Sequence, residues 1–130
     1  MLQRLYLGLN NFIGRIPLEI GNLSNLEILS IPSFSQTGPI PSFVFNMSTL
    51  KVIQFGYNNL SGSLPVDIYL NLPELVELYL YSNQFTGGIP ATFGNLTRLQ
   101  NLYLYGNNLA GFIAFLEARS HAMLIYISHD

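Results

Sequence analysis

The sequence contains no cysteine and no tryptophan, and only 9% of its 130 residues are charged. Without cysteine, neither a disulfide framework nor a cysteine-ligated zinc site can form. Five Lys and Arg against seven Asp and Glu leave no basic surface for phosphates, so we expect no nucleic-acid partner. No window approaches the roughly 18 apolar residues of a membrane span, so we expect no direct membrane insertion. The hydrophobic content of 49% and the low charge indicate one folded domain.

Motifs of catalytic sites are also lacking. The two histidines, His121 and His129, have no second pair of ligands with which to complete a metal site. Glu74 and Glu77 are close in sequence, but a turn position and a strand position do not make an acid–base pair. No phosphate-binding loop, nucleophile elbow or kinase signature occurs. We therefore expect a chain that is not an enzyme and that uses no cofactor and no metal.

A repeat of 24 or 25 residues organises most of the chain. Its five units open at Leu2, Leu26, Leu50, Leu75 and Leu99. A second leucine-type residue follows after three positions and a third after two more; most units then have an asparagine, a glycine and an Ile-Pro pair. The alternating apolar residues predict one half-buried strand per unit, near 4–7, 28–31, 52–55, 77–80 and 101–104. Stacked units of this kind bury one continuous core.

Two units and the C-terminal segment depart from this pattern. Phe34 stands where the other units have asparagine, so we expect a distorted rung there, because phenylalanine has no amide to bond the backbone. The third unit has an additional residue near 69–71, which should bulge on the convex side. Residues 115–130 match no repeat. For them two interpretations remain open, a short capping helix near 115–124 or a disordered segment.

The pattern L-x-x-L-x-L-x-x-N-x-L-x-G-x-I-P resembles the plant-type leucine-rich repeat of receptor-like kinases and receptor-like proteins. The resemblance covers residues 1–114 and implies an α/β-type solenoid. This would be a horseshoe segment of about five repeats, with a parallel concave sheet and a convex side of turns and 3-10 or short helices.

The same resemblance implies a function. The chain would be a peptide- or protein-binding ectodomain segment that acts in plant signal perception, for defence or development. A co-receptor would be a further partner. An inhibitor of cell-wall polygalacturonases and a truncated product without independent function are the alternatives. The chain begins inside a repeat and has no signal peptide, so we expect a fragment. The parent protein would lie at the extracellular face of the plasma membrane or in the cell wall, and its kinase domain would not be in these residues.

Tyrosine gathers at strand positions that face away from the core. Five of the eight tyrosines converge there on one patch of the concave face, namely Tyr57, Tyr79, Tyr81, Tyr103 and Tyr105. Tyrosine offers a large apolar area and a hydroxyl at a small entropic cost, which suits peptide recognition. It also favours exposed strand positions where no ligand binds. With Glu77 and Asn101 beside them, these solvent-facing residues are the predicted concave ligand site.

Four Asn-x-Ser/Thr sequons begin at Asn22, Asn46, Asn59 and Asn95. Three of them, at Asn22, Asn46 and Asn95, fall at the same phase of their units. Glycans at these positions would follow one flank of the solenoid and leave the concave face open. The same residues also form a common turn of the repeat, so the pattern does not decide whether they are modified.

Overall fold

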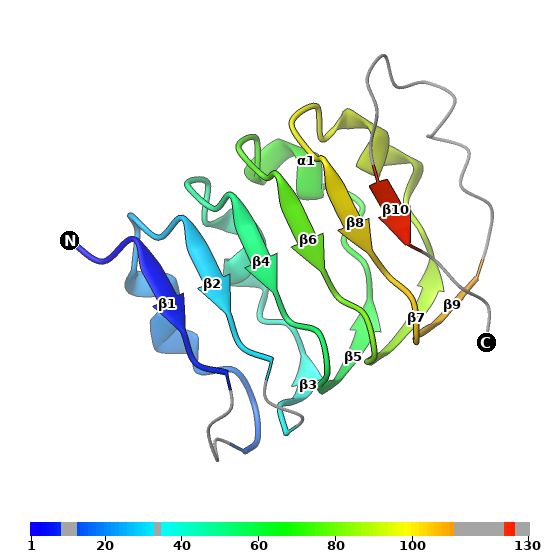
Figure 1. Cartoon of the computed structure of the whole chain (residues 1–130), viewed down its shortest axis with the longest axis horizontal. Coiled ribbons are helices and arrows are strands. Elements are labelled where there is room, and N and C mark those ends of the chain that lie inside the picture. The colour runs from blue at the N-terminus through cyan, green and yellow to red at the C-terminus, as the bar shows by residue number, and fades with distance from the viewer. Residues whose placement is uncertain (9–12, 33–34, 111–123, 127–130) are drawn as a thin grey trace.

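The concave wall of the protein is a six-stranded parallel sheet. The computed structural model describes residues 1–8, 13–32, 35–110 and 124–126. Its strands lie in the order β1 (Arg4–Tyr6), β2 (Ile28–Ser30), β4 (Val52–Gln54), β6 (Glu77–Tyr79), β8 (Asn101–Tyr103) and β10 (Leu124–Tyr126) (Figure 1). Neighbouring strands pair in the register of the repeat, with Leu5 beside Leu29 and Ile53 beside Leu78. The five strands expected from the repeat are confirmed.

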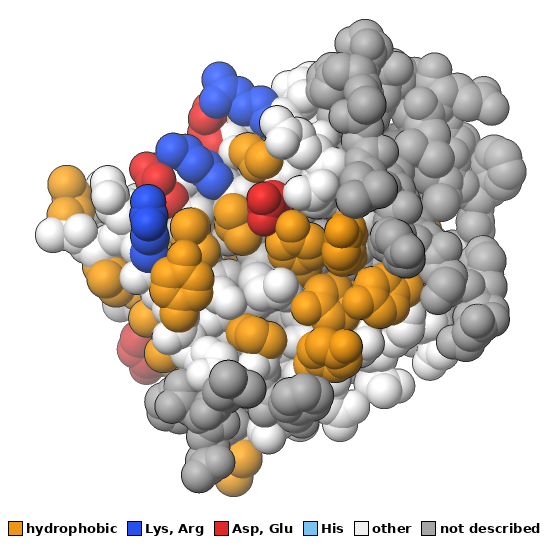
Figure 2. Space-filling model, in the orientation of Figure 1, with side chains coloured by type: hydrophobic (Ala, Val, Ile, Leu, Met, Phe, Trp, Pro, Cys, Tyr) orange, Lys and Arg blue, Asp and Glu red, His pale blue; other side chains and the backbone are white. Residues whose placement is uncertain are grey.

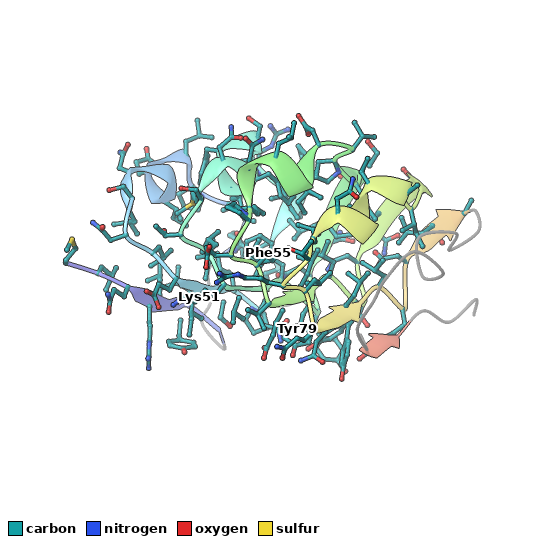
Figure 3. All side chains as sticks on the ribbon, turned by 90° about the horizontal axis from the view of Figure 1, so that it is seen from above. Lys51, Phe55 and Tyr79 are labelled. Carbon is teal, nitrogen blue, oxygen red and sulfur yellow. The ribbon has the colours of Figure 1, made fainter. Side chains whose placement is uncertain are left out.

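The alternation along each strand separates a core side from a solvent side. The central inward residues Leu29, Ile53, Leu78 and Leu102 are all 0% exposed. Figure 3 shows Phe55 between the concave strands and the helices, whereas Tyr79 lies on the opposite side of the sheet. Burying a leucine or phenylalanine side chain contributes about 1.5–3 kcal/mol. The stacked inward columns therefore supply most of the stabilisation.

Asparagine side chains close the turns after β4, β6 and β8. Asn83 is 3% exposed, and its Nδ2 donates to the carbonyls of Phe55 at 2.9 Å and Leu80 at 3.2 Å. Its Oδ1 accepts from the amide of Leu60 at 2.9 Å. Asn58 and Asn107 make the equivalent bonds in their own units. The amides thus satisfy backbone groups freed where the strands end, as expected from their position in the repeat.

A second parallel sheet, which the sequence did not predict, follows these asparagines. It contains β3 (Thr37–Pro39), β5 (Asn59–Ser63), β7 (Gln84–Gly88) and β9 (Asn108–Ala110), in that order. Figure 1 shows it along one edge of the solenoid. Three of these segments, β3, β5 and β7, contain glycine, which has low strand propensity. They become strands because each unit places an extended copy beside the next, so that their backbone groups pair.

Short helices form the side of the molecule opposite the concave sheet. Three are 3-10 helices, η1 (Leu18–Asn22), η2 (Ser42–Asn46) and η3 (Ala91–Asn95). The third unit instead has a turn of α-helix, α1 (Ile68–Asn71), closed by a 3.1 Å bond from the amide of Leu72 to the carbonyl of Ile68. An α-helical turn holds more residues than a 3-10 turn. The additional residue of this unit is therefore accommodated on the convex side, where the bulge was expected.

The two ends of the described solenoid differ from its middle. In the first unit Leu2 is 48% exposed, and Leu5 and Leu7 are only partly buried. At the other end β10 pairs with β8, a strand that the sequence pattern did not predict. The edge of β8 offers unpaired backbone groups to any extended segment that reaches it. The predicted distortion at Phe34 and most of the proposed capping helix lie outside the described residues.

Candidate ligand-binding surface

Five tyrosines meet on the concave face over β6, β8 and the turn after β4. We call Tyr57, Tyr79, Tyr81, Tyr103 and Tyr105 the tyrosine cluster. Parallel strands lie about 4.8 Å apart, so tyrosines at equivalent positions in successive units come within ring-packing distance. Figure 2 shows the resulting patch of apolar and tyrosine side chains over β6 and β8, with charged side chains gathered near the start of the strands. The structure thus brings together all five tyrosines of the predicted site.

The rings of the tyrosine cluster pack in the two arrangements that aromatic pairs prefer. Tyr81 and Tyr105 stack with their ring centroids 5.0 Å apart and an interplanar angle of 9°. Tyr79 meets Tyr103 edge to face at 4.9 Å and 81°, and Tyr57 meets Tyr81 at 5.1 Å and 87°. Such pairs contribute about 0.5–1.5 kcal/mol each beyond the burial of their area. The rings therefore hold one another in place without a ligand.

This packing reduces the area that each tyrosine of the cluster exposes to solvent. Tyr57 is 45% exposed, whereas Tyr79, Tyr81, Tyr103 and Tyr105 are half-buried. The repeat period correctly predicts the side of the strand on which a residue lies. It does not indicate that large side chains in adjacent units cover one another.

Gly56 and Tyr57 set the border of the cluster. The ring of Tyr81 lies directly over Gly56, where a Cβ atom would come within 2.4 Å of Cζ of that ring. Only glycine leaves room for the ring in this position. Tyr57 has a φ of 55°, in the left-handed region that bulky residues rarely adopt. The equivalent residues of the next two units, Ser82 and Gly106, are also left-handed, with φ of 54° and 70°, so this conformation belongs to the turn of the repeat.

Polar side chains hold one end of the cluster. The hydroxyl of Tyr79 donates to Oε2 of Glu77 at 2.9 Å, and Nδ2 of Asn101 donates to the same hydroxyl oxygen at 3.4 Å. Burial, together with the hydrogen bond and the negative charge of Glu77, raises the pKa of Tyr79 to about 12. Burial also raises the pKa of Tyr81. Both phenols are therefore neutral hydrogen-bonding groups at physiological pH, and Glu77 and Asn101 lie where the prediction put them.

Comparison with known proteins agrees with this architecture. The leucine-rich repeat family matches residues 1–23, and its two-copy form matches residues 73–118. The plant peptide hormone receptor RGFR1, solved with RGF2, is 40% identical, with a TM-score of 0.77 over 82% of this chain and 17% of the receptor. The ectodomain of the plant membrane receptor kinase GASSHO1/SCHENGEN3 from Arabidopsis thaliana, solved with CASPARIAN STRIP INTEGRITY FACTOR 2, is 36% identical. Its TM-score is 0.81 over 98% of this chain and 16% of the ectodomain.

The chain is a plant-type leucine-rich repeat protein. It is of the kind found in plant receptor kinase ectodomains. A plant ice-binding protein shares the fold, at 37% identity and a TM-score of 0.78 over 86% of this chain and 36% of that protein. This leucine-rich repeat chain therefore spans about a sixth of the two receptor chains and about a third of the ice-binding protein. No curated protein matches its sequence.

The sequon asparagines of the leucine-rich repeat chain lie on its convex side and flank. Asn22, Asn46 and Asn95 are the exposed last residues of η1, η2 and η3. Asn59 is the exposed first residue of β5. None of the four is in the tyrosine cluster, so glycans attached to them would leave the concave rings uncovered. Their modification stays a prediction.

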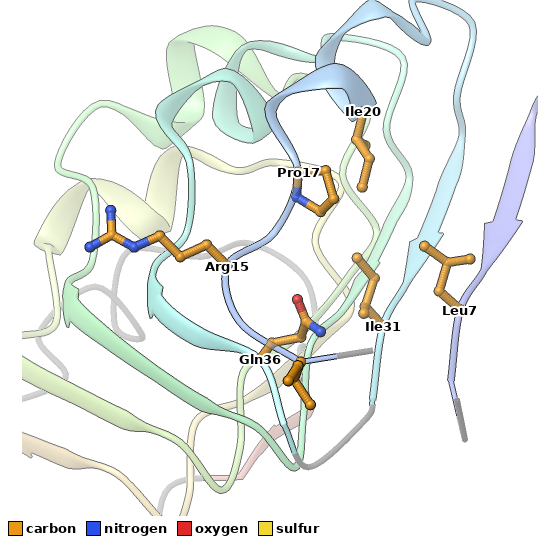
Figure 4. A pocket seen from close by; sticks show the side chains of 7 residues that line it. Leu7, Arg15, Pro17, Ile20, Ile31 and Gln36 are labelled. Carbon is orange, nitrogen blue, oxygen red and sulfur yellow. The ribbon is translucent and has the colours of Figure 1, made fainter. Parts of the chain in front are cut away.

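This leucine-rich repeat chain also has a pocket of about 310 Å³ near its N-terminal end, on the core side of the sheet (Figure 4). Leu7, Ile20 and Ile31 give it an apolar lining, and Arg15 and Gln36 add polar groups. Its lining residues lie on both sides of two gaps in the described chain, so the pocket supports no assignment. None of the described helices has the length and apolar character needed to cross a membrane.

Sequence reasoning found the residues of the surface and missed parts of its construction. It did not foresee that Gly56 makes room for Tyr81 or that Tyr57 is left-handed. One signal for the space above Gly56 was available in the sequence, because Gly56 and Tyr57 occupy the repeat positions at which the next unit has Tyr81 and Ser82. A glycine opposite a tyrosine in the same column indicates a ring that needs space. The hydrogen bond between Tyr79 and Glu77 had no such signal.

Proposed function

We propose that this chain is a ligand-binding segment of a plant leucine-rich repeat receptor ectodomain, and that it binds a peptide or protein through the tyrosine cluster. The observation that carries the proposal is the set of five tyrosines packed ring to ring on an otherwise sparsely charged concave face. In this role the chain acts as a binding module and not as an enzyme. The parent receptor would present it on the extracellular side of the plasma membrane.

The physical basis is preorganisation. A free side chain loses about 0.5–1.5 kcal/mol of conformational entropy when a partner immobilises it. The rings of Tyr79, Tyr81, Tyr103 and Tyr105 are already restrained by their neighbours, so most of this cost is met during folding. Aromatic residues in well-packed central patches also tend to dominate binding energy. The cluster therefore has the properties of a recognition surface as well as those of stable strand surface.

Related structures support a peptide or protein ligand. Two of the receptor structures named above contain a bound factor, RGF2 in one and CASPARIAN STRIP INTEGRITY FACTOR 2 in the other. The fold alone does not distinguish a receptor from the plant ice-binding protein, which matches equally well. The tyrosine cluster, and not the solenoid, is therefore the reason to prefer recognition of a peptide or protein. A co-receptor would be a second partner of the whole receptor.

A displayed peptide library provides a direct test. Random dodecapeptides would be selected on the full chain, and the affinity of enriched peptides would be measured on a variant with Tyr81→Ala and Tyr105→Ala. We expect at least a tenfold loss, because the stacked pair is the centre of the cluster. The control is Gln84→Ala, an exposed residue of β7 outside the cluster. Peptides that bind the double variant as well as the parent, with circular dichroism showing both folded, would contradict the proposal.

A further inference from the structure

One carboxylate at the cluster has no cationic partner among the described residues. Elsewhere in this part of the chain, ion pairs join Lys51 to Glu27 and Arg98 to Glu74. Within the described ranges, Glu77 has neither a lysine nor an arginine within ion-pair distance, and its carboxylate accepts one hydrogen bond, from the hydroxyl of Tyr79 to Oε2. Its second oxygen, Oε1, accepts no hydrogen bond from a described residue. Glu77 therefore presents a negative charge at the border of an aromatic surface.

The described neighbours of Glu77 do not compensate its charge. In the sheet it lies between Val52 of β4 and Asn101 of β8, which are both uncharged. Its side chain is half-buried, so an ion pair formed there would be screened less than one in open solvent. The paired rings of Tyr79 and Tyr103 begin two residues further along the strands. An anion beside aromatic rings is the arrangement that attracts an arginine or lysine side chain.

We propose that Glu77, with Tyr79 and Tyr103, is the subsite that binds a basic side chain of the peptide ligand. This inference rests on the proposed function and specifies the chemistry of the ligand. The guanidinium or ammonium group would pair with the Glu77 carboxylate, and its aliphatic stem would lie against the two rings. Asn101 would keep the hydroxyl of Tyr79 oriented through its existing hydrogen bond. Glu77 would then be a specificity residue, and the rest of the cluster would supply apolar contact.

The test uses two small probes that differ only in charge. N-acetyl-arginine amide and N-acetyl-citrulline amide have nearly the same shape, but citrulline is neutral. Each would be titrated into the isotope-labelled full chain while backbone amide shifts are followed by NMR. We expect the arginine probe to shift residues of β6 and β8, with an affinity about tenfold higher than that of the citrulline probe. Equal binding of the two probes to the parent chain would overturn the inference.

Two matched substitutions locate the effect. Glu77→Gln keeps the shape of the side chain and removes its charge, so it should abolish the preference for arginine. Glu74→Gln removes a carboxylate that pairs with Arg98 outside the cluster, and it should leave the preference unchanged. An arginine preference that survives Glu77→Gln, or that Glu74→Gln also removes, would contradict the assignment. The comparison of probes on the parent chain is decisive even where a variant folds poorly.

The library experiment separates this inference from the proposed function. Peptides that require Tyr81 and Tyr105 but tolerate Glu77→Gln would leave the binding function intact and reject the basic subsite. Absence of any peptide dependent on the tyrosines would reject the binding function, whatever the probe titration gives. Enriched peptides with a basic residue, each weakened about tenfold by Glu77→Gln, would support both.

Discussion

The two halves of the concave sheet share one backbone and differ in their surfaces. In β1, β2 and β4 the central outward positions contain Tyr6, Ser30 and Gln54, of which Tyr6 alone is aromatic. In β6 and β8 the equivalent positions contain Tyr79 and Tyr103, which pack together. The inward residues are leucine or isoleucine in both halves. The core requirement thus repeats in every unit, whereas outward residues vary without altering the fold.

The border between the halves lies at the end of β4. Gly56 leaves space beneath the ring of Tyr81, and the ring of Tyr57 packs nearly perpendicular to that same ring. Residues that follow β4, in the half with few aromatic side chains, therefore shape the half that contains the tyrosine cluster. This dependence means that the two surfaces are not independent, although their cores are alike.

The largest effect should come from breaking the core that both halves share. Leu80 is 0% exposed, so Leu80→Asp would bury a charge without a partner. We expect a loss of at least about 5 kcal/mol, comparable with the whole stability of a small domain. Both halves should unfold, because each rung is stabilised by the next. Far-UV circular dichroism and thermal melting check this, with Thr86→Asp at an exposed β7 position as control. An unchanged melting curve for Leu80→Asp would contradict the repeat alignment.

An intermediate effect is expected at the border. Gly56→Ala places a Cβ atom 2.4 Å from the ring of Tyr81, so the ring must move away from its stacked partner. Overpacking of this kind costs about 1–3 kcal/mol. The near-UV circular dichroism of the tyrosines should change while the far-UV spectrum persists. Gly88→Ala is the matched control, because its Cβ would meet nothing closer than 3.7 Å. Equal spectra for the two variants would show that the halves are independent.

The smallest effect concerns alkaline pH and the aromatic half alone. The pKa of Tyr79 is about 12 in the folded protein, against 10.0 for an ordinary tyrosine. Above about pH 10 the unfolded chain ionises first, so the stability present below pH 10 falls as the pH rises towards 12. Tyr79→Phe removes this ionisation and should make the fall shallower. Urea unfolding midpoints between pH 9 and 11 measure the slope, and parallel curves for parent and variant would be the contrary result.

Prediction from sequence succeeded where one residue type repeats at one position. The five strands of the repeat and the asparagine bonds follow from columns that recur every 24 or 25 residues. It failed for β10, where Leu124–Tyr126 pairs with β8 although the preceding residues do not match the repeat. It failed also for the second sheet, because segments such as Thr37–Pro39 have little strand propensity by themselves. Those strands exist through pairing between units, which no single unit encodes.

The sequence by itself determined the side of the sheet on which each residue lies. A period of two within a strand and of 24 or 25 between strands is sufficient to place Leu78 in the core and Tyr79 on the surface. Only the tertiary structure decided how the surface residues meet. The stacking of Tyr81 on Tyr105 and the bond from Tyr79 to Glu77 depend on rotamers, twist and strand spacing. These quantities arise when separate units pack, so local sequence patterns do not contain them.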